Sequence, residues 1–493
     1  MTRRPSAALP AMLACVDMGS NSFRLEIGRV EGGQIFRLDT VRETLRMGAG
    51  IDERGRLTAH AQREALACLA RFGERLRGFD PANVRAVATN TFRVAGNAAT
   101  FLPRAAAALG FPIDVIAGHE EARLIYLGVS HVLPPGDAPR LVVDIGGGST
   151  EFIVGRGMHP ERLESLKLGC VTMSVRFFGD GTLSKRAFDD AQTHAQAEVE
   201  AIAREFSRRH WREAYASSGT ALALADILEQ NGLSVAGITP DGLAKLRKRM
   251  IDAGHIKRLR LAGLKAERAP VLAGGFAVMA AAIDELDVPR INPVGGALRL
   301  GVLYDLLGRR EHRDSREATV AAFVERYHVD RAHGERVAAL ARDLYRKAAP
   351  RPVADVERHV GWAALLHEVG YTVSHIGFHK HGAYILGNAD MPGFSRQDQE
   401  RLALLVLGCR GGLEKVAPAL ADPTLRAKVL ALRLAVIFFH ARRPIDIPRV
   451  AIRPGRAFDV RVPQSWVRAH PLTGHLLEKE RDEWRRAGWP WRR

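Results

Sequence analysis

The chain has 493 residues, is 46% hydrophobic and carries a formal net charge of +17 at pH 7. This length allows about three domains of roughly 100 to 200 residues each, and the apolar content suffices for buried cores, so we expect a soluble globular protein. No run of about 18 apolar residues occurs, which excludes a membrane-spanning helix. The positive charge favours a polyanionic partner, whether nucleic acid, an acidic membrane surface or a phosphate polymer.

The first residues do not form a convincing signal peptide. Arg3 and Arg4 precede a short apolar stretch, but Pro5 and Pro10 interrupt it and it leads directly into a predicted strand. The four cysteines have no metal or disulfide spacing and are expected to be reduced core residues. We therefore expect a cytoplasmic protein, with peripheral membrane association left open.

The first third of the chain alternates strands and helices. The pattern predicts strands at 12–17, 22–30 and 33–40, a helix at about 58–77 with Thr58 as its N-cap, a strand at 84–89, a helix at 96–109, a strand at 113–117 and a helix at about 118–131. Pro134-Pro135-Gly136 then breaks the alternation. We expect the first domain boundary there.

The scheme starts again after this break. Strands are expected at 140–145, 150–155 and 162–168, followed by long helices at 184–207 and about 268–286, with Tyr304–Arg310 closing the region. Beyond Arg313, helical periodicity dominates for over 100 residues. The predicted domains are therefore two α/β domains at 1–134 and 135–310, a helical domain at 311–440 and a small basic domain at 441–493.

Two segments of the chain are almost alike. Val16–Ile27 and Val143–Val154 each contain an apolar run, an Asp, a turn of small residues and a second alternating run, which predicts strand, tight loop and strand. Gly and Ser allow N–H groups to approach an anion, and the Asp can hold a neutralising cation. One such hairpin is often an ordinary β-turn. Two copies, 127 positions apart, predict two similar halves that grip a phosphate from both sides.

This pair of hairpins resembles the actin-like ATPase superfamily, whose duplicated ribonuclease-H-like domains include sugar kinases, acetate kinases and polyphosphate hydrolases. At this level a resemblance implies a fold and not a reaction. The expected fold class is α/β, with two ribonuclease-H-like domains followed by a helical region.

A third segment favours hydrolysis. In Ala117–Tyr126, a Gly turn precedes Glu120 and Glu121 in the first turn of a predicted helix. Acidic residues there are ordinarily partners of the helix dipole. Next to two phosphate hairpins, one of them can instead orient a water molecule and take its proton, as attack of water on a phosphoryl group requires.

Four motifs in this order resemble the exopolyphosphatase/guanosine pentaphosphate phosphohydrolase (Ppx/GppA) family over essentially the whole chain: Asp17–Arg24, Glu120–Ile125, Asp144–Glu151 and Ser218–Thr220. The resemblance implies that Glu121 activates water and that Asp144 and Glu151 hold Mg²⁺, with Mn²⁺ and a monovalent cation left open. It also implies a set of residues that contact the phosphates, namely Asp17, Gly19, Ser20, Asn21, Ser22, Gly146, Gly147, Gly148, Ser149, Thr150, Gly219 and Thr220.

Two arginines join this set. Arg93 ends a segment that resembles the next loop of the family and can clamp a phosphate bidentately, although an ordinary surface Arg is the alternative. Arg268 precedes Val271–Ala277, which resembles the nucleotide-base loop of actin-like kinases, although its paired glycines also suit close packing. Val294–Gly301 departs from the family's Ser-Asp-Gly-Ala-Leu-Arg-Glu-Gly and loses polar groups at 294, 295 and 300.

The rear of the chain resembles an HD phosphohydrolase domain that has lost its metal site. His333 and His367 match the expected ligands, but Glu368 replaces an Asp, and Val436 stands where the last Asp would be. We therefore expect a degenerate HD-like domain without a tightly bound transition metal. His379 and His381 are expected to contact phosphate, in a segment that resembles the long bacterial exopolyphosphatases.

The resemblance implies removal of terminal phosphates from inorganic polyphosphate. Residues 401–493 contain 19 Lys and Arg but only 8 Asp and Glu, and this positive excess favours either a surface that binds the polymer or simply a solvated face. No motif for specific nucleic-acid recognition accompanies these charges. The alternatives are hydrolysis of guanosine pentaphosphate (pppGpp), an actin-like phosphotransferase or ATPase, and a non-catalytic polyphosphate-binding protein. A homodimer is left open.

Overall fold

The computed structural model describes residues 12–31, 33–310, 314–349, 351–453 and 458–491. The chain divides into two compact units, the first ending at Ser315 and the second beginning at Arg316. The predicted division into four domains is finer than this and stays a prediction. None of the described helices is both long and apolar enough to cross a bilayer.

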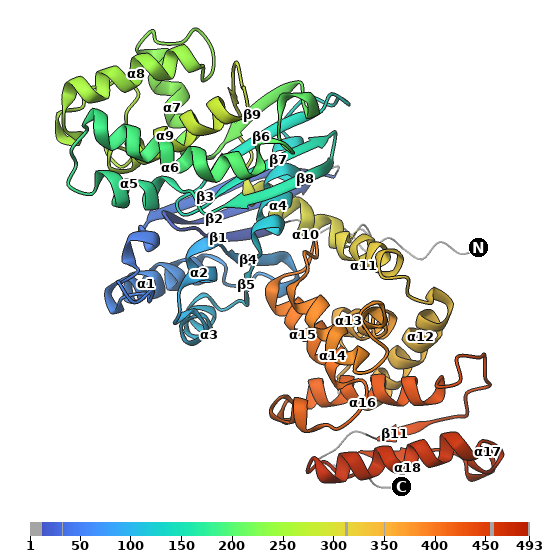
Figure 1. Cartoon of the computed structure of the whole chain (residues 1–493). Helices are drawn as coiled ribbons and strands as arrows, with labels where there is room; N and C mark the ends of the chain where they lie inside the picture. The colour runs from blue at the N-terminus through green and yellow to red at the C-terminus, as the bar shows by residue number, and fades with distance from the viewer. Residues whose placement is uncertain (1–11, 32, 311–313, 350, 454–457, 492–493) are drawn as a thin grey trace. The chain divides into compact units, whose positions relative to one another are not determined.

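The first unit begins with a five-stranded sheet. Its strands are β1 (Met12–Met18), β2 (Ser22–Glu31), β3 (Gln34–Thr44), β4 (Val84–Ala88) and β5 (Ile113–Val115), in the order β3-β2-β1-β4-β5. The β1–β2 and β2–β3 pairs are antiparallel, whereas β4 and β5 continue the sheet in parallel. Strand β1 is buried because helices cover both faces of the sheet (Figure 1).

A second sheet repeats this topology. Its strands are β6 (Arg140–Ile145), β7 (Thr150–Arg156), β8 (His159–Leu166), β9 (Glu213–Ser217) and β10 (Asn292–Pro293), in the order β8-β7-β6-β9-β10. The pattern of antiparallel and parallel pairs is the same. The two similar sequence segments therefore belong to a duplicated domain. The two mixed sheets confirm the predicted actin-like architecture.

Helices connect and cover the two sheets. They are α1 (Ala59–Arg75), α2 (Asn90–Val94), α3 (Ala98–Leu109), α4 (Gly118–Ser130), α5 (Cys170–Phe178), α6 (Lys185–Ala203), α7 (Ser218–Gln230), α8 (Pro240–Ala253), α9 (Ala269–Glu285) and α10 (Leu298–Arg310). The predicted N-cap of α1 is confirmed, because Thr58 Oγ1 accepts a hydrogen bond from the Ala61 amide at 3.2 Å.

Sequence periodicity did not resolve part of the second half. Strand β9 ends at Ser217 and α7 begins at Ser218 without a loop between them, and the small residues Ser-Ser-Gly-Thr at this junction carry no apolar period. Helices α5 and α8 and the short α2 were also not predicted. Strand β8 begins at His159 and not at 162, because an edge strand of the sheet tolerates Pro160.

A close crossing of α4 and α10 joins the two halves of the first unit. A Cβ atom on Gly128 would lie 2.7 Å from the Gly301 amide nitrogen, and one on Gly301 would collide with the Leu124 carbonyl oxygen. Only glycine allows this approach. The crossing fixes the helix that carries Glu121 against the helix that carries Arg299.

The second unit is mainly helical. Its elements are α11 (Ser315–Arg326), α12 (Arg331–Ala348), α13 (Ala354–Leu365), α14 (Phe378–Asn388), α15 (Arg396–Gly408), α16 (Pro423–Phe438), a hairpin of β11 (Ala451–Arg453) and β12 (Asp459–Arg461), α17 (Gln464–Ala469) and α18 (Pro471–Arg486). It has its own apolar core. A buried ion pair between Arg433 and Glu480 ties α18 to α16 at 2.5 Å. The helical region is as predicted, and its assignment as HD-like stays a prediction.

Candidate active site

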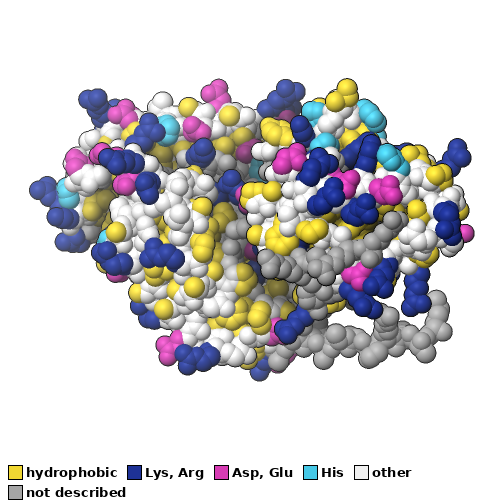
Figure 2. Space-filling view, turned by 90° about the horizontal axis from the view of Figure 1, so that it is seen from below, with side chains coloured by type: hydrophobic (Ala, Val, Ile, Leu, Met, Phe, Trp, Pro, Cys, Tyr) yellow, Lys and Arg dark blue, Asp and Glu magenta, His cyan; other side chains and the backbone are white. Residues whose placement is uncertain are grey.

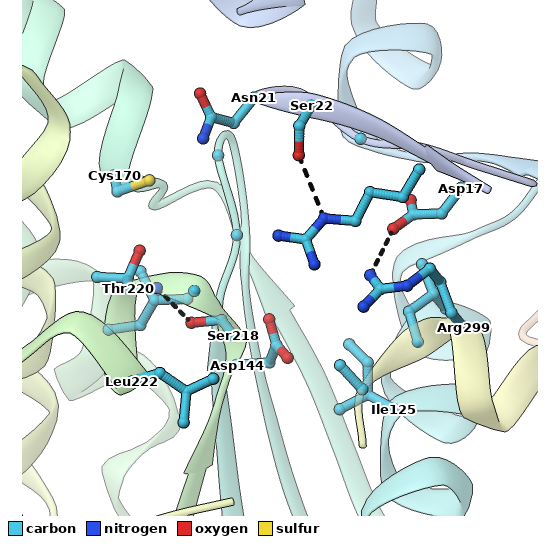
Figure 3. A pocket seen from close by; sticks show the side chains of 18 of the residues that line it. Asp17, Asn21, Ser22, Ile125, Asp144, Cys170, Ser218, Thr220, Leu222 and Arg299 are labelled. Atoms are coloured by element: carbon cyan, nitrogen blue, oxygen red, sulfur yellow. Dashed lines mark hydrogen bonds and ion pairs between the residues drawn. The ribbon is translucent and has the colours of Figure 1, made fainter. Parts of the chain in front are cut away.

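A cavity of about 420 Å³ lies in the first unit, between the loops of the two hairpins (Figure 3). The β1–β2 loop contributes Gly19–Ser22 and the β6–β7 loop contributes Gly146–Ser149. The N-terminus of α7 contributes Ser218–Thr220, so residues from all four sequence motifs line the cavity. Thr150 and Glu151 are buried and do not line it.

The two hairpin loops touch each other. A Cβ atom on Gly147 would lie 2.9 Å from Ser20 Cβ and 3.0 Å from the Asn21 nitrogen. Ser20 is itself held by Thr91 Oγ1, which donates to Ser20 Oγ at 2.8 Å. Glycine is therefore required at the contact, and the two loops form one continuous surface for an anion.

Glu121 lies at the N-terminus of α4 and borders the cavity. Arg93 Nη1 donates to its Oε2 at 2.7 Å and also to the Ile116 carbonyl at 3.1 Å. Burial raises the pKa of Glu121, and the Arg93 guanidinium opposes that shift. Arg93, predicted to contact phosphate, thus contacts the predicted base in this structure.

Glu120 has a different environment from Glu121. Arg123 donates to both of its carboxylate oxygens, at 2.7 and 2.9 Å, and Arg123 also donates to Asp305 at 2.6 Å. Arg85 donates to the same aspartate at 2.8 Å. This buried network neutralises Glu120 away from the cavity, which leaves Glu121 as the carboxylate of the pair that faces it.

Two buried carboxylates stand on neighbouring strands of the second sheet. Asp144 on β6 and Glu151 on β7 are cross-strand partners. Ser217 hydrogen-bonds Asp144, and Ser165 Oγ donates to Glu151 Oε1 at 2.9 Å. Burial raises the pKa of Asp144 to about 6 and raises that of Glu151 well above its usual value, and the charge of Glu121 adds to both shifts.

This donor set suits magnesium. It is made of hard carboxylate oxygens whose mutual repulsion a divalent cation would relieve. Among the described residues, three ligand atoms from His, Cys, Asp or Glu come within 4.8 Å of one another only at His333, His367 and Glu368 of the second unit. The cavity therefore offers an incomplete shell, which fits Mg²⁺ because this ion is usually held by one or two carboxylates together with substrate phosphates.

Asp17, the counterpart of Asp144 in the first hairpin, has a cationic partner. Arg299 Nη1 lies 3.4 Å from Asp17 Oδ2, and Arg299 Nε donates to Glu26 at 3.0 Å (Figure 3). Burial raises the pKa of Asp17, and Arg299 opposes the shift. From the sequence, Arg299 was noted only as part of the divergent Val294–Gly301 segment, and its contact with Asp17 was not predicted.

Four further arginines line the cavity: Arg24, Arg37, Arg42 and Arg268. Burial, together with the charges of Arg299, Arg42 and Arg268, lowers the pKa of Arg24 to about 10. Its Nε donates to Ser22 Oγ at 3.4 Å. Only Arg268 was predicted. Arg24 could have been found, because it is two residues after Ser22 on a strand and so shares its face.

The remaining predicted residues divide between the two units. Ser218 has a φ of 91°, unusual for a residue with a side chain, and its Oγ accepts hydrogen bonds from the Thr220 and Ala221 amides at 3.2 Å. Thr150 Oγ1 donates to the Leu168 carbonyl at 2.6 Å.

His379 and His381 belong to α14 of the second unit and do not line this cavity.

The divergent Val294–Gly301 segment forms part of the wall. Val294, Gly295, Gly296 and Leu300 line the cavity, so the polar groups lost relative to the family pattern are lost from its surface. Gly296 has a φ of 76° and stands at the start of α10. The helix forms without the missing polar residues.

The fold also has relatives of known structure. An exopolyphosphatase from Cytophaga hutchinsonii is similar, with 24% identity and a TM-score of 0.55, over 60% of this chain and 98% of that chain. The Aquifex aeolicus member of the Ppx/GppA family is similar, with 26% identity and a TM-score of 0.51, over 61% of this chain and 99% of that chain.

Family models match both units. The model of the Ppx/GppA phosphatase family matches residues 27–310, and that of Ppx/GppA phosphatase domain III matches residues 315–481. The first match begins within β2, after the loop of the first hairpin, and covers the whole second sheet with its hairpin. This chain belongs to the Ppx/GppA phosphatase family.

Proposed function

We propose that this protein is an exopolyphosphatase, which releases the terminal phosphate of inorganic polyphosphate by attack of water. The observation that carries the proposal is the contact of two phosphate hairpins beside a buried glutamate, in a cavity whose rim holds several arginines. The arrangement supplies an anion cradle, a base and positive charge at one place, which phosphoryl transfer to water requires.

Glu121 is proposed as the base. Burial raises its pKa, which makes the carboxylate a stronger base toward a bound water. Arg93 fixes its orientation through the 2.7 Å hydrogen bond. A water placed between Glu121 and the terminal phosphate would lose its proton to Oε1, the oxygen that Arg93 does not hold.

Positive groups stabilise the charge that develops on the phosphoryl oxygens. Burial and the charges of Arg299, Arg42 and Arg268 lower the pKa of Arg24, and phosphate oxygens would offset the repulsion among these arginines. Bound Mg²⁺ on Asp144 and Glu151 would neutralise the transferred phosphoryl group and the leaving phosphate.

A polymer substrate is favoured by the distribution of charge. The net charge of +17 greatly exceeds what a few terminal phosphates need. Lys and Arg side chains are spread over the face shown in Figure 2, between apolar and acidic ones, and do not form one compact patch. Distributed cations suit a long anion that makes many weak contacts.

A second candidate is hydrolysis of pppGpp. The observation that favours it is the apolar part of the cavity lining, where Leu222 is 41% exposed and Leu300 is partly exposed. A purine base could cover this surface, whereas a polyphosphate chain would leave it in contact with water.

The test is phosphate release from long-chain polyphosphate and from pppGpp, measured side by side with magnesium present or chelated. We expect faster release from polyphosphate, and loss of both activities on chelation. A higher kcat/KM for pppGpp would reverse the order of the two candidates. Release from neither substrate would contradict the proposed reaction, and phosphate transferred to a sugar or acetate would indicate a kinase.

A further inference from the structure

The second unit contains a cluster with the composition of a metal site. His333 on α12 and His367 and Glu368 after α13 place one ligand atom each within 4.8 Å of one another, and all three are buried. Two imidazoles and one carboxylate form a set that zinc takes with three protein ligands. The Nδ1 of His367 is 2.6 Å from the Ala364 carbonyl, which leaves Nε2 as the free ligand nitrogen.

A guanidinium occupies the position where the cation would be needed. Arg442 Nη1 donates to Glu368 Oε1 at 2.5 Å. The same oxygen lies 3.7 Å from His333 Nε2 and 3.8 Å from His367 Nε2. A divalent ion bonded to this oxygen would meet a fixed positive charge at hydrogen-bond distance, and the two would repel each other.

Other contacts hold Arg442 in this position. Its Nη2 lies 3.2 Å from Asp330 Oδ2, and its carbonyl oxygen accepts a hydrogen bond from Arg336 Nη2 at 3.0 Å. Its backbone has a φ of 58°, which a residue with a side chain adopts only when its surroundings hold it there. Arg442 is also 43% exposed, whereas Glu368 is 7% exposed, so Arg442 stands between the cluster and solvent.

We propose that Arg442 is the built-in cation of this cluster and that it keeps a latent transition-metal site closed. The donor set fits a metal, but the guanidinium already supplies the charge that the buried carboxylate requires. This inference is independent of the reaction in the first unit. It also predicts that a chelator acts on this protein through the cavity of the first unit and not through the second.

The test compares metal binding by the wild type with that by Arg442→Gly. Glycine removes the guanidinium and suits the left-handed backbone, so this variant should fold. We expect it to bind one equivalent of Zn²⁺ at least 100-fold more tightly than the wild type in competition with a chromophoric chelator. Co²⁺ should give the visible absorption of a four-coordinate site. The matched control is Arg443→Ala, which removes a neighbouring exposed charge and should bind zinc as the wild type does.

A second substitution assigns the site. His367→Ala in the Arg442→Gly background should abolish the gained zinc. The proposal fails if the purified wild type holds stoichiometric zinc, manganese or iron that His367→Ala removes. It fails equally if folded Arg442→Gly gains no metal. Should Arg442→Gly not fold, Arg442→Leu, which also removes the charge, is measured in the same way and decides the question by the same outcomes.

Discussion

Arg93 and Glu121 form a largely buried ion pair at the edge of the cavity, with Nη1 of the arginine 2.7 Å from Oε2 of the glutamate. The pair joins the end of helix α2 to the beginning of α4. Because one carboxylate oxygen is engaged, the other is left to act on a ligand in the cavity. The arginine thereby sets both the orientation and the ionisation of the glutamate.

Replacement of Glu121 by Gln should lower kcat by two to four powers of ten, the usual contribution of a general base. The amide keeps the size of the side chain, so folding and polyphosphate binding should persist. The measurement is steady-state phosphate release with substrate binding followed separately. Normal turnover in this variant would place the base elsewhere.

Glu120→Gln is the matched control for that experiment. Glu120 is paired with Arg123 within a buried network and does not line the cavity. Its replacement should lower stability by about 3 kcal/mol, because Arg123 would keep only Asp305 as a carboxylate partner within a buried cluster that also holds Arg85, whereas the turnover of the folded enzyme should change little. Thermal unfolding and kcat measured on the same sample separate the two effects. A kcat loss as large as that of Glu121→Gln would contradict the assignment.

Asp144→Asn should raise the magnesium concentration needed for half-maximal activity, because a neutral amide is a much weaker ligand for a hard cation. The titration varies the concentration of free Mg²⁺, which is calculated for each point to allow for chelation by the substrate. Without magnesium at pH 8, the same variant should be more stable than the wild type by about 1 to 3 kcal/mol. An unchanged magnesium curve would contradict the metal assignment.

The sign of that stability change follows from the pKa of Asp144. Burial raises this pKa to about 6, above its value in an unfolded chain. The folded state therefore binds the proton more tightly, and the contribution of Asp144 to stability is lost as pH rises from about 4 to about 6. The gain from Asp144→Asn should be present at pH 8 and absent near pH 4, which unfolding measured at both pH values will show.

Magnesium and protons should compete for the same carboxylate. As pH falls below about 6, the magnesium needed for half-maximal activity should rise by about tenfold per pH unit, because Asp144 must lose its proton to bind the ion. Saturating magnesium should restore most of the activity at pH 5.5. A magnesium requirement that does not depend on pH between 5 and 7 would exclude Asp144 as a ligand.

A chain that stops after Ser315 should fold and hydrolyse short polyphosphates. The apolar cores of the first unit include no residue beyond Ser315, so the second unit is not needed to complete them. For long chains we expect a higher KM and a weaker dependence on salt, since fewer phosphates are neutralised. If the truncated protein has the same KM and salt dependence for long chains as the full protein, the basic C-terminal region is only a solvated surface.

The sequence predicted the architecture of the first unit because that architecture is duplicated. The repeat of Asp17 and Asp144, each in a strand before a small-residue turn, identified both sheets and both hairpins. The elements that were missed lie where hydrophobic periodicity gives little information, as at the Ser217–Thr220 junction of β9 and α7, which consists of small residues. The two compact units could not be located from composition alone.

The residues of the candidate site that lie in recognisable motifs were predicted from the sequence, whereas those outside the motifs were missed. Glu121 and Asp144 stand in recognisable segments, whereas Arg42 and Arg299 reach the cavity from elements remote in sequence. Their roles depend on how strands and helices pack, which local pattern does not encode. Part of the C-terminal positive charge is also compensated within the second unit, since Arg433 and Arg442 are paired with Glu480 and Glu368.

The two halves share a topology, yet their equivalent aspartates have become chemically different. Asp17 lies within 3.4 Å of the guanidinium of Arg299, whereas the partners of Asp144 are the hydroxyl of Ser217 and the cross-strand carboxylate of Glu151. We therefore expect a cation to bind at Asp144 and not at Asp17. The duplicated fold thus has a built-in polarity.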